Sequence, residues 1–320
     1  MPTVNMAPFK RRIITSVADA GEISFDRFTA ADIPRVARLA ALSGSRGCDL
    51  TVGGIFLWQS YFRYRRAFVG DTMLLRGVNE DDVSMQAFSL PLGIMPLAQS
   101  VSLLRDYCDL TGSHLRFSAV PEERVDELRA LGATSVIELT DWADYVYDAT
   151  ELASLTGKRF NKKRNHVNRF RADNPGFELC EMTSDMAPSL LDFMNRLPVD
   201  GSKPLMADYE RRQVIDLLRD LPDFLQVMEG GVLTTPTDGI VAFTIGEIVG
   251  DTLHLHVEKM RHDIAGAGEA INMLFAALST ARHPQIRYIN RQDDAGDPGL
   301  RRAKESYHPL YRLRKYNVIF

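Results

Sequence analysis

Three ionisable residues alternate with apolar ones in a short segment of the C-terminal half. His254, His256 and Glu258 occupy every second position of LHLHVE. Because side chains alternate between the two faces of a strand, this spacing predicts that all three point to one face. Such a row indicates a polar cleft in which Glu258 serves as a general base. A metal site is the alternative use of His-x-His-x-Glu, but no second ligand motif accompanies it, so we expect no metal.

A turn that contains glycine follows this strand directly. The segment RHDIAGAG ends with Gly266 and Gly268 and leads into an apolar helix expected over 269–281. Backbone N–H groups at a helix N-terminus attract anions, and glycines allow a ligand to approach them closely. The segment has neither the lysine of a P-loop nor the full G-x-G-x-x-G spacing. It therefore indicates either a weak anion site or a tight packing turn.

Basic residues are concentrated in two segments of an otherwise acidic chain. Residues 158–171, KRFNKKRNHVNRFR, contain seven basic side chains and no acidic one. The second segment lies near the C-terminus and has Glu305 as its only acid; its basic residues are Arg301, Arg302, Lys304, Arg312, Arg314 and Lys315. The whole chain has 38 Lys and Arg residues against 42 Asp and Glu residues, so the remainder is strongly negative. We interpret the two segments as lining one cleft that binds a polyanion. A solvated helix face with a basic tail is the alternative.

Bulk composition is typical of a soluble globular protein. The 320 residues are enough for two domains, and 45% hydrophobic with 25% charged residues argues against disorder. Three widely spaced cysteines, Cys48, Cys108 and Cys180, favour reduced thiols in the cytoplasm. The sequence shows neither a signal peptide nor an apolar run of the ~18 residues that span a bilayer. We therefore predict a cytoplasmic protein that could still contact a membrane surface.

The elements that must position these residues occur in a similar order in both halves. A strand-like segment at 23–28 precedes an amphipathic helix that opens at Asp32, and a second such segment at 177–182 precedes a helix that opens at Asp185. Further strands are expected over 225–234, 239–248, 252–259 and 286–290. The pattern predicts an α/β (α+β) protein with mixed sheets flanked by helices. The two predicted domains are residues 1–150 and 151–320.

Two segments resemble one protein family. Residues 158–170 (KRFNKKRNHVNRF) and 288–316 (YINRQDDAGDPGLRRAKESYHPLYRLRKY) are similar to signature segments of the phosphatidylglycerol lysyltransferase C-terminal domain family, the DUF2156-type proteins. The first segment is also similar to that of the FemX-type peptidoglycan aminoacyltransferases. The element order resembles that of GNAT acyltransferases and occurs twice. The resemblance thus implies two tandem GNAT-like domains, with the active cleft in or beside the second.

The resemblance also implies a reaction. It is the transfer of an aminoacyl group from a charged tRNA to a lipid or another amine or hydroxyl acceptor. On this reading Glu258 takes the proton of the acceptor, and the donor ester is oriented or its oxyanion stabilised by Asn290, Arg291, Lys304 or Tyr307. The residues expected to bind the donor are Lys162, Lys163, Arg164, Asn165, His166, Arg169, Gly266, Gly268, Arg301 and His308. Asp293, Gly299 and Leu300 also match the second signature segment.

Two other functions fit the same sequence. One is an acyltransferase that uses coenzyme A as donor and acylates an amine. The other is a protein without catalytic activity that binds RNA or a nucleotide on a GNAT scaffold. Both of these functions also require a polyanionic ligand, and neither predicts DNA as a partner. The acceptor is not identified by the residues.

Overall fold

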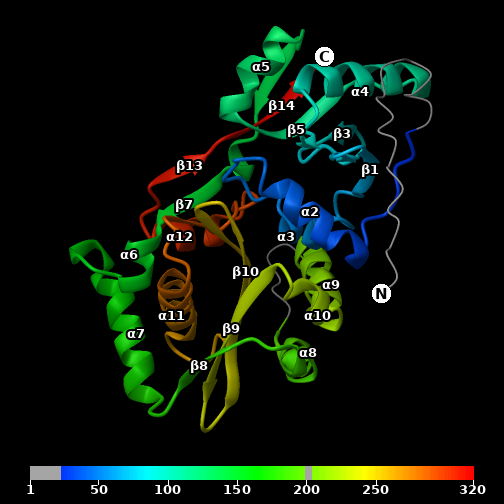
Figure 1. Ribbon diagram of the computed structural model, residues 1–320. Coiled ribbons are helices and arrows are strands. Elements are labelled where there is room, and N and C mark those ends of the chain that lie inside the picture. The colour runs from blue at the N-terminus through cyan, green and yellow to red at the C-terminus, as the bar shows by residue number, and fades with distance from the viewer. Residues whose placement is uncertain (1–22, 199–203) are drawn as a thin grey trace, which may run out of the picture.

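The computed structural model describes residues 23–198 and 204–320, which form two mixed β-sheets with helices packed around them (Figure 1). The first sheet has the order β1-β2-β3-β5-β14-β6, with β4 paired to β2. Its strands are β1 (Arg65–Val69), β2 (Thr72–Val78), β3 (Gln86–Phe88), β4 (Leu92–Gly93), β5 (Arg116–Pro121), β6 (Ser135–Glu138) and β14 (Lys315–Ile319). The predicted class, α/β with mixed sheets flanked by helices, is confirmed.

The second sheet has the order β13-β7-β12-β11-β10-β9-β8. Its strands are β7 (Asp144–Asp148), β8 (Glu178–Glu181), β9 (Met228–Thr235), β10 (Gly239–Val249), β11 (Thr252–Met260), β12 (Tyr288–Asn290) and β13 (Tyr311–Leu313). The helices are α2 (Ile33–Ala40), α3 (Val52–Trp58), α4 (Leu97–Thr111), α5 (Val125–Ala130), α6 (Ala149–Ser154), α7 (Asn161–Asp173), α8 (Ala187–Arg196), α9 (Pro204–Arg219), α10 (Leu221–Phe224), α11 (Ala267–Arg282) and α12 (Pro298–Glu305). Within the described part of the chain, none of these helices could cross a bilayer.

The two sheets exchange strands. The last strand of the chain, β14, pairs with β5 and β6 of the first sheet, whereas β7 pairs with β12 and β13 of the second. Figure 1 shows β14 in red beside β5, and β7 in green beside β13. The first sheet therefore needs a strand from the far end of the chain, whereas β7 comes from the middle of the chain. β7 lies before residue 150 although most of its sheet lies after it, and β14 lies after residue 150 although most of its sheet lies before it. A domain division at residue 150 stays a prediction.

The N-terminal elements differ from the sequence prediction at one place. The strand expected at 23–28 contributes only an isolated bridge between Asp26 and Arg66. The helix expected after it is present: a 3₁₀ turn, Ala30–Asp32, leads into α2. The same arrangement recurs before α8, and a proline lies in the first turn of both α2 and α8. Proline suits that turn, where backbone N–H groups have no helical partner.

The parallel pair β11 and β12 creates the edge on which the candidate site is built. The pairing covers only Thr252–His254 against Tyr288–Asn290, and β11 then continues to Met260 paired with β10. The crossover between the two strands is α11, a largely buried helix that packs on the second sheet. Polar residues that follow a parallel strand collect at its carboxyl end, where open α/β sheets bind ligands. Glu258 and Arg291 both lie beyond the paired residues.

Gly266 is required where α11 meets α7. It caps α11 with φ of +81°, and a Cβ there would lie 2.3 Å from the backbone oxygen of His166 in α7. Any side chain would combine an unfavourable backbone angle with a steric clash against a helix. Gly268 packs more loosely, against Met260. The structure therefore contains the packing turn considered for this segment, and donor binding by Gly266 and Gly268 stays a prediction.

Candidate active site

A group of polar and aromatic side chains comes together where β11, β12, α7, α11 and the end of α12 meet. We call it the Arg291 cluster, and its members are Lys163, Glu258, Glu269, Asn272, Arg291 and Tyr307. Glu258 is on β11 and Arg291 follows β12, so both lie at the carboxyl end of the parallel pair. Lys163 comes from α7, whereas Glu269 and Asn272 come from the first turns of α11.

An ion pair forms the centre of the cluster. Arg291 Nη2 donates to both carboxylate oxygens of Glu258, at 3.0 and 3.1 Å, and Asn272 Nδ2 donates to Oε2 at 3.2 Å. The guanidinium lies 4.8 Å from the ring centroid of Tyr307. The side chains of Arg291 and Glu258 are only 13% and 17% exposed, so water screens the pair weakly. Burial raises the pKa of Tyr307, which keeps its phenol protonated.

A second ion pair lies on the side of the cluster that faces α7. Lys163 Nζ is 3.4 Å from Glu269 Oε1 and 4.0 Å from the ring centroid of Tyr307. His166 Nδ1 lies 3.9 Å from the same carboxylate oxygen. Burial lowers the pKa of Lys163. Because Glu269 places a negative charge in the first turn of α11, a pyrophosphate at this helix N-terminus would meet electrostatic repulsion.

Two polar atoms of the cluster have no partner. Arg291 Nη1 and Asn272 Oδ1 are buried without a hydrogen bond to any residue in 23–198 or 204–320. A buried polar group that loses its hydrogen bonds to water costs about 1–3 kcal/mol when nothing replaces them. One donor and one acceptor are thus available beside the Glu258 carboxylate. They give the cluster the capacity to bind a polar group.

The prediction that His254, His256 and Glu258 share one face is correct for the two histidines, whose rings stack with centroids 6.2 Å apart, and wrong for Glu258. Opposite Ile245 and Gly246 of β10, a β-bulge makes His256 an extra residue of β11, because Val257 pairs with Ile245 and Leu255 pairs with Gly246. His256 contacts Thr51 and Glu247 on the α3 side, whereas Glu258 contacts α11. An extra residue in one strand reverses the alternation of faces beyond it. Both histidines are buried, so the row lines no polar cleft.

His254 is fully buried, and neither ring nitrogen has a partner within the described ranges. Burial, the first cause, lowers its pKa to about 4. The unfolded chain therefore takes up a proton near pH 6.5, whereas the folded protein excludes it until about pH 4. The free energy of unfolding therefore decreases as the pH is lowered from 6.5 to 4.

In the wild type, His254 should lower the free energy of unfolding by up to about 3 kcal/mol between pH 6.5 and pH 4. We expect His254→Leu to abolish this decrease, because leucine cannot be protonated. Urea unfolding at several pH values measures this. The exposed His262→Leu is the matched control and should keep the wild-type slope. An identical slope in His254→Leu and wild type would contradict the prediction.

Asn290 and Lys304 lie in a buried network beside the cluster. Asn290 Nδ2 donates to Asp144 Oδ2 at 2.8 Å and to the backbone oxygen of Arg46 at 2.7 Å. Lys304 Nζ donates to the backbone oxygen of Asp293, and burial lowers its pKa to about 8. These contacts hold the chain on both sides of Arg291. Direct catalytic roles for Asn290 and Lys304 stay predictions.

The same network connects the two sheets. Lys315 Nζ on β14 lies 2.7 Å from Asp144 Oδ1 on β7 and 2.7 Å from Asp49 Oδ2. Cys48, Asp144 and Asp293 have potential metal-ligand atoms within 4.8 Å of one another. The ammonium of Lys315 already supplies a positive charge at Asp144. The geometry therefore supports a structural ion pair better than a cation site.

The first basic segment presents part of its charge to solvent. Lys162, Asn165 and Arg169 are exposed on α7, and Arg169 Nε makes a pair with Asp173 at 3.3 Å. Arg164 instead donates to the backbone oxygens of Leu155 and Gly157 and so holds the end of α6. Donor binding by these residues stays a prediction, with Lys162 and Arg169 best placed for it.

The interpretation that both basic segments line one cleft is wrong for the end of the second segment, and donor binding by Arg301 and His308 stays a prediction. Arg301 pairs with Asp294 and Asp141. Arg314 pairs with Glu122 and Glu138 on the first sheet. His308 contacts the backbone oxygen of Arg159 instead of the Arg291 cluster. The chain passes from β13 in the second sheet to β14 in the first sheet, so the charged side chains at its end lie away from α7.

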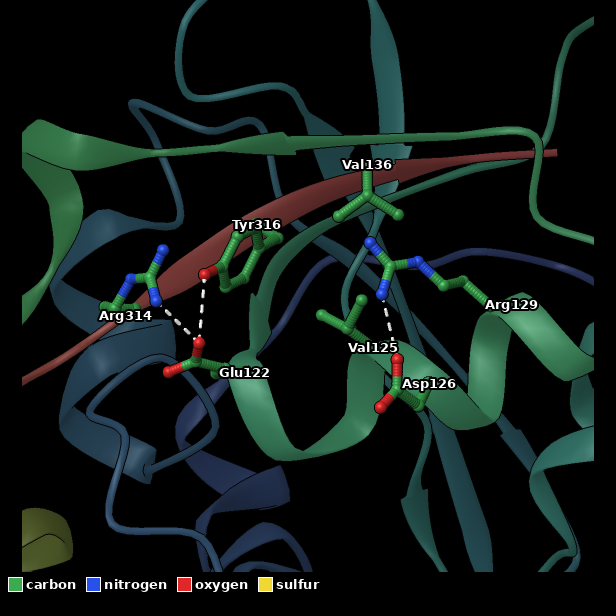
Figure 2. Close-up of a pocket in the computed structure, with 7 residues that line it drawn as sticks. All are labelled: Glu122, Val125, Asp126, Arg129, Val136, Arg314 and Tyr316. Carbon is green, nitrogen blue, oxygen red and sulfur yellow. Dashed lines mark hydrogen bonds and ion pairs between the residues drawn. The ribbon is translucent and has the colours of Figure 1, made fainter.

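A pocket of about 220 Å³ lies elsewhere, on the first sheet (Figure 2). It is lined by Glu122, Val125, Asp126, Arg129, Val136, Arg314 and Tyr316. Figure 2 shows its charged side chains joined in pairs, Arg314 to Glu122 and Arg129 to Asp126. No member of the Arg291 cluster lines it. With its charges neutralised in pairs, this pocket is a weaker candidate than the cluster.

Asn272 and Glu269 were missed by sequence reasoning. Both lie in a helix that is otherwise apolar, EAINMLFAAL, and the lone asparagine among buried residues was the available signal. The exchange of strands that brings Lys315 to Asp144 left no comparable signal. Their positions are 171 residues apart in the chain.

Comparisons with known proteins give a consistent result. A family model described as phosphatidylglycerol lysyltransferase, C-terminal, matches residues 40–319. A comparison with curated proteins finds no match. The chain is similar to the structure of a conserved protein of unknown function from Bacteroides thetaiotaomicron, with 30% identity, a TM-score of 0.81, and coverage of 93% of this chain and 99% of that one.

Two further structures share the fold at lower identity. L-PGS from Bacillus licheniformis is 14% identical with a TM-score of 0.62, over 89% of this chain and 91% of that one. FemX is 10% identical with a TM-score of 0.58, over 93% of this chain and 97% of that one. The predicted GNAT-like, FemX-related architecture is thereby confirmed.

Proposed function

The chain belongs to the phosphatidylglycerol lysyltransferase C-terminal family, and from this premise we propose that it transfers an aminoacyl group from an aminoacyl-tRNA to an amine or hydroxyl acceptor. The observation that carries the proposal is the buried Arg291 cluster, with a free donor and a free acceptor at the carboxyl end of the parallel strands. Exposed Lys162 and Arg169 on the adjoining α7 support an RNA donor. A cytoplasmic location is part of the proposal, because charged tRNA is made there.

The proposed step is attack of the acceptor on the ester carbonyl of the donor. Glu258 accepts the proton of the attacking hydroxyl or amine, and the new bond forms between that atom and the carbonyl carbon. Arg291 Nη1 donates to the carbonyl oxygen as it gains negative charge. The bond from the carbonyl carbon to the ribose oxygen then breaks, and the ribose oxygen takes up the proton from Glu258. The products are the acylated acceptor and uncharged tRNA.

A transfer assay tests the proposed function. The chain is incubated with a mixture of radiolabelled aminoacyl-tRNAs and with vesicles that contain phosphatidylglycerol, or with peptides that present free amines. We expect label to move from tRNA to one acceptor class. Tight, salt-dependent tRNA binding without transfer would favour the non-catalytic alternative. Acylation of an amine from acyl-coenzyme A alone would favour the other alternative.

We expect Glu258→Gln to lower the turnover of the transfer by about 10²–10³-fold, because glutamine cannot accept the proton. Donor affinity should change far less, since the amide still bonds to Arg291. Single-turnover kinetics and a binding titration separate the two effects. Glu210→Gln, which loosens a surface pair with Lys259, is the control and should retain activity. Full activity in Glu258→Gln would exclude it as the base.

A further inference from the structure

The free acceptor of the Arg291 cluster points to a specificity role for a residue that the proposed reaction has not used. We infer that Asn272 recognises the α-ammonium group of the aminoacyl ester, an inference that rests on the proposed function. Asn272 is 1% exposed, lies on α11 and has an unpartnered Oδ1. It would select donors that carry an α-amine over simple acyl donors.

The orientation of the Asn272 amide follows from its one partner. Glu258 Oε2 lies 3.2 Å from the amide, and an ionised carboxylate can only accept hydrogen bonds. The nitrogen of Asn272 must therefore face Glu258, and the oxygen must face away from it. Exchanging the two atoms would place oxygen against oxygen. The free atom is thus an acceptor, which requires a ligand group that donates.

Arg291 supplies the complementary atom. Its Nη2 donates to the carboxylate that also accepts from the Asn272 amide nitrogen, so the free Nη1 and the free Oδ1 belong to two groups held by the same Glu258 carboxylate. A ligand that satisfies both must carry an acceptor and a donor close together. The carbonyl oxygen and the α-ammonium of an aminoacyl ester lie on adjacent carbon atoms and meet this requirement. A simple acyl ester satisfies only Arg291.

The other charges around the free atoms are already engaged. Glu258 binds Arg291, and Glu269 pairs with Lys163 at 3.4 Å. Both free atoms are shielded from solvent, so a side chain must move before a donor reaches them. Lys163 is the member of the cluster suited to this movement. Its side chain is long and rotatable, and its 3.4 Å distance to Glu269 is longer than that of a close ion pair.

A pair of non-hydrolysable probes tests the inference without catalysis. One is adenosine with an alanyl group attached through a 3′-amide, and the other is the same molecule with a propionyl group, which lacks the α-amine. Calorimetry on the wild-type chain measures both affinities at the same salt concentration. We expect the alanyl probe to bind on the order of tenfold to a hundredfold more tightly.

A variant then assigns the preference to Asn272. In Asn272→Leu the alanyl probe should lose its advantage, whereas affinity for the propionyl probe should change little. Asn174→Leu, at the end of α7, is the matched control and should keep the preference. A purely structural role for Asn272 would weaken both probes equally, which would overturn the inference.

The wild-type comparison also keeps the two proposals distinguishable. Equal affinity for both probes in a chain that transfers aminoacyl groups overturns the role of Asn272 and leaves the proposed function in place. Binding of neither probe, together with no transfer, overturns the proposed function itself. If Asn272→Leu does not fold, Asn272→Ser, which also lacks the amide oxygen, is tested with the same two probes.

Discussion

Replacing Arg291 with alanine is expected to reduce aminoacyl transfer by about 10²–10³-fold, the usual loss when one oxyanion donor is removed. Arg291 carries the free Nη1 and also holds Glu258 through two hydrogen bonds. Both the stabilising charge and the orientation of the base would be lost together. The measurement is kcat/KM for transfer from a single aminoacyl-tRNA.

The loss must be separated from a folding defect. Without the guanidinium, the Glu258 carboxylate is left buried and unpaired, which costs about 3–5 kcal/mol of stability. The double variant Arg291→Ala with Glu258→Gln removes that unpaired charge and should recover stability but not activity. Arg291→Lys should fold and retain little activity, because an ammonium lacks the planar fork.

A matched arginine is available for comparison. Arg314 pairs with Glu122 and Glu138 at the pocket of Figure 2, on the other sheet. Arg314→Ala should leave transfer close to wild type. If Arg291→Ala and Arg314→Ala are equally active, the Arg291 cluster is not the site of the reaction.

Lys315→Ala is expected to lower the free energy of unfolding by about 3–5 kcal/mol. Lys315 is 1% exposed, and its ammonium lies 2.7 Å from Asp144 and 2.7 Å from Asp49. Its removal leaves the fully buried Asp144 without its counter-charge at the junction of the two sheets. Urea unfolding followed by circular dichroism measures the change.

The pH dependence provides a second readout of the same pair. Burial alone would raise the pKa of Asp144, but the Lys315 charge and the hydrogen bonds from Lys315, Asn290 and the Cys48 backbone together outweigh it, so the pKa lies below the ordinary value. A lowered carboxyl pKa stabilises the fold above the unfolded value of ~3.9, and this contribution is lost as pH falls through the folded pKa. In Lys315→Ala this acid-dependent contribution should disappear.

Lys259→Ala is the matched control for the buried lysine. Lys259 pairs with Glu210 at 2.8 Å, with side chains 22% and 31% exposed. Solvent screens such a pair, so its loss should cost less than about 1 kcal/mol. A similarly small effect of Lys315→Ala would show that the buried pair does not hold the sheets together.

Four of the residues that the sequence indicated come together, although the geometry differs from the prediction. Lys163, Glu258, Arg291 and Tyr307 were all named from sequence and meet in one cluster. The histidine row was misread because a β-bulge reverses the strand faces after His256. A bulge depends on how two strands pair, so periodicity in one strand does not reveal it.

The amino-acid sequence by itself determined the α/β class, the repeated element order and the residues available for chemistry, because hydrophobic periodicity and short motifs are local properties of a chain. Only the tertiary structure decided which of those residues meet. The exchange of β7 and β14 between the sheets placed Lys315 beside Asp144 and carried Arg314 away from α7. Such pairings join positions far apart in the chain, and their energies depend on burial, which no single segment specifies.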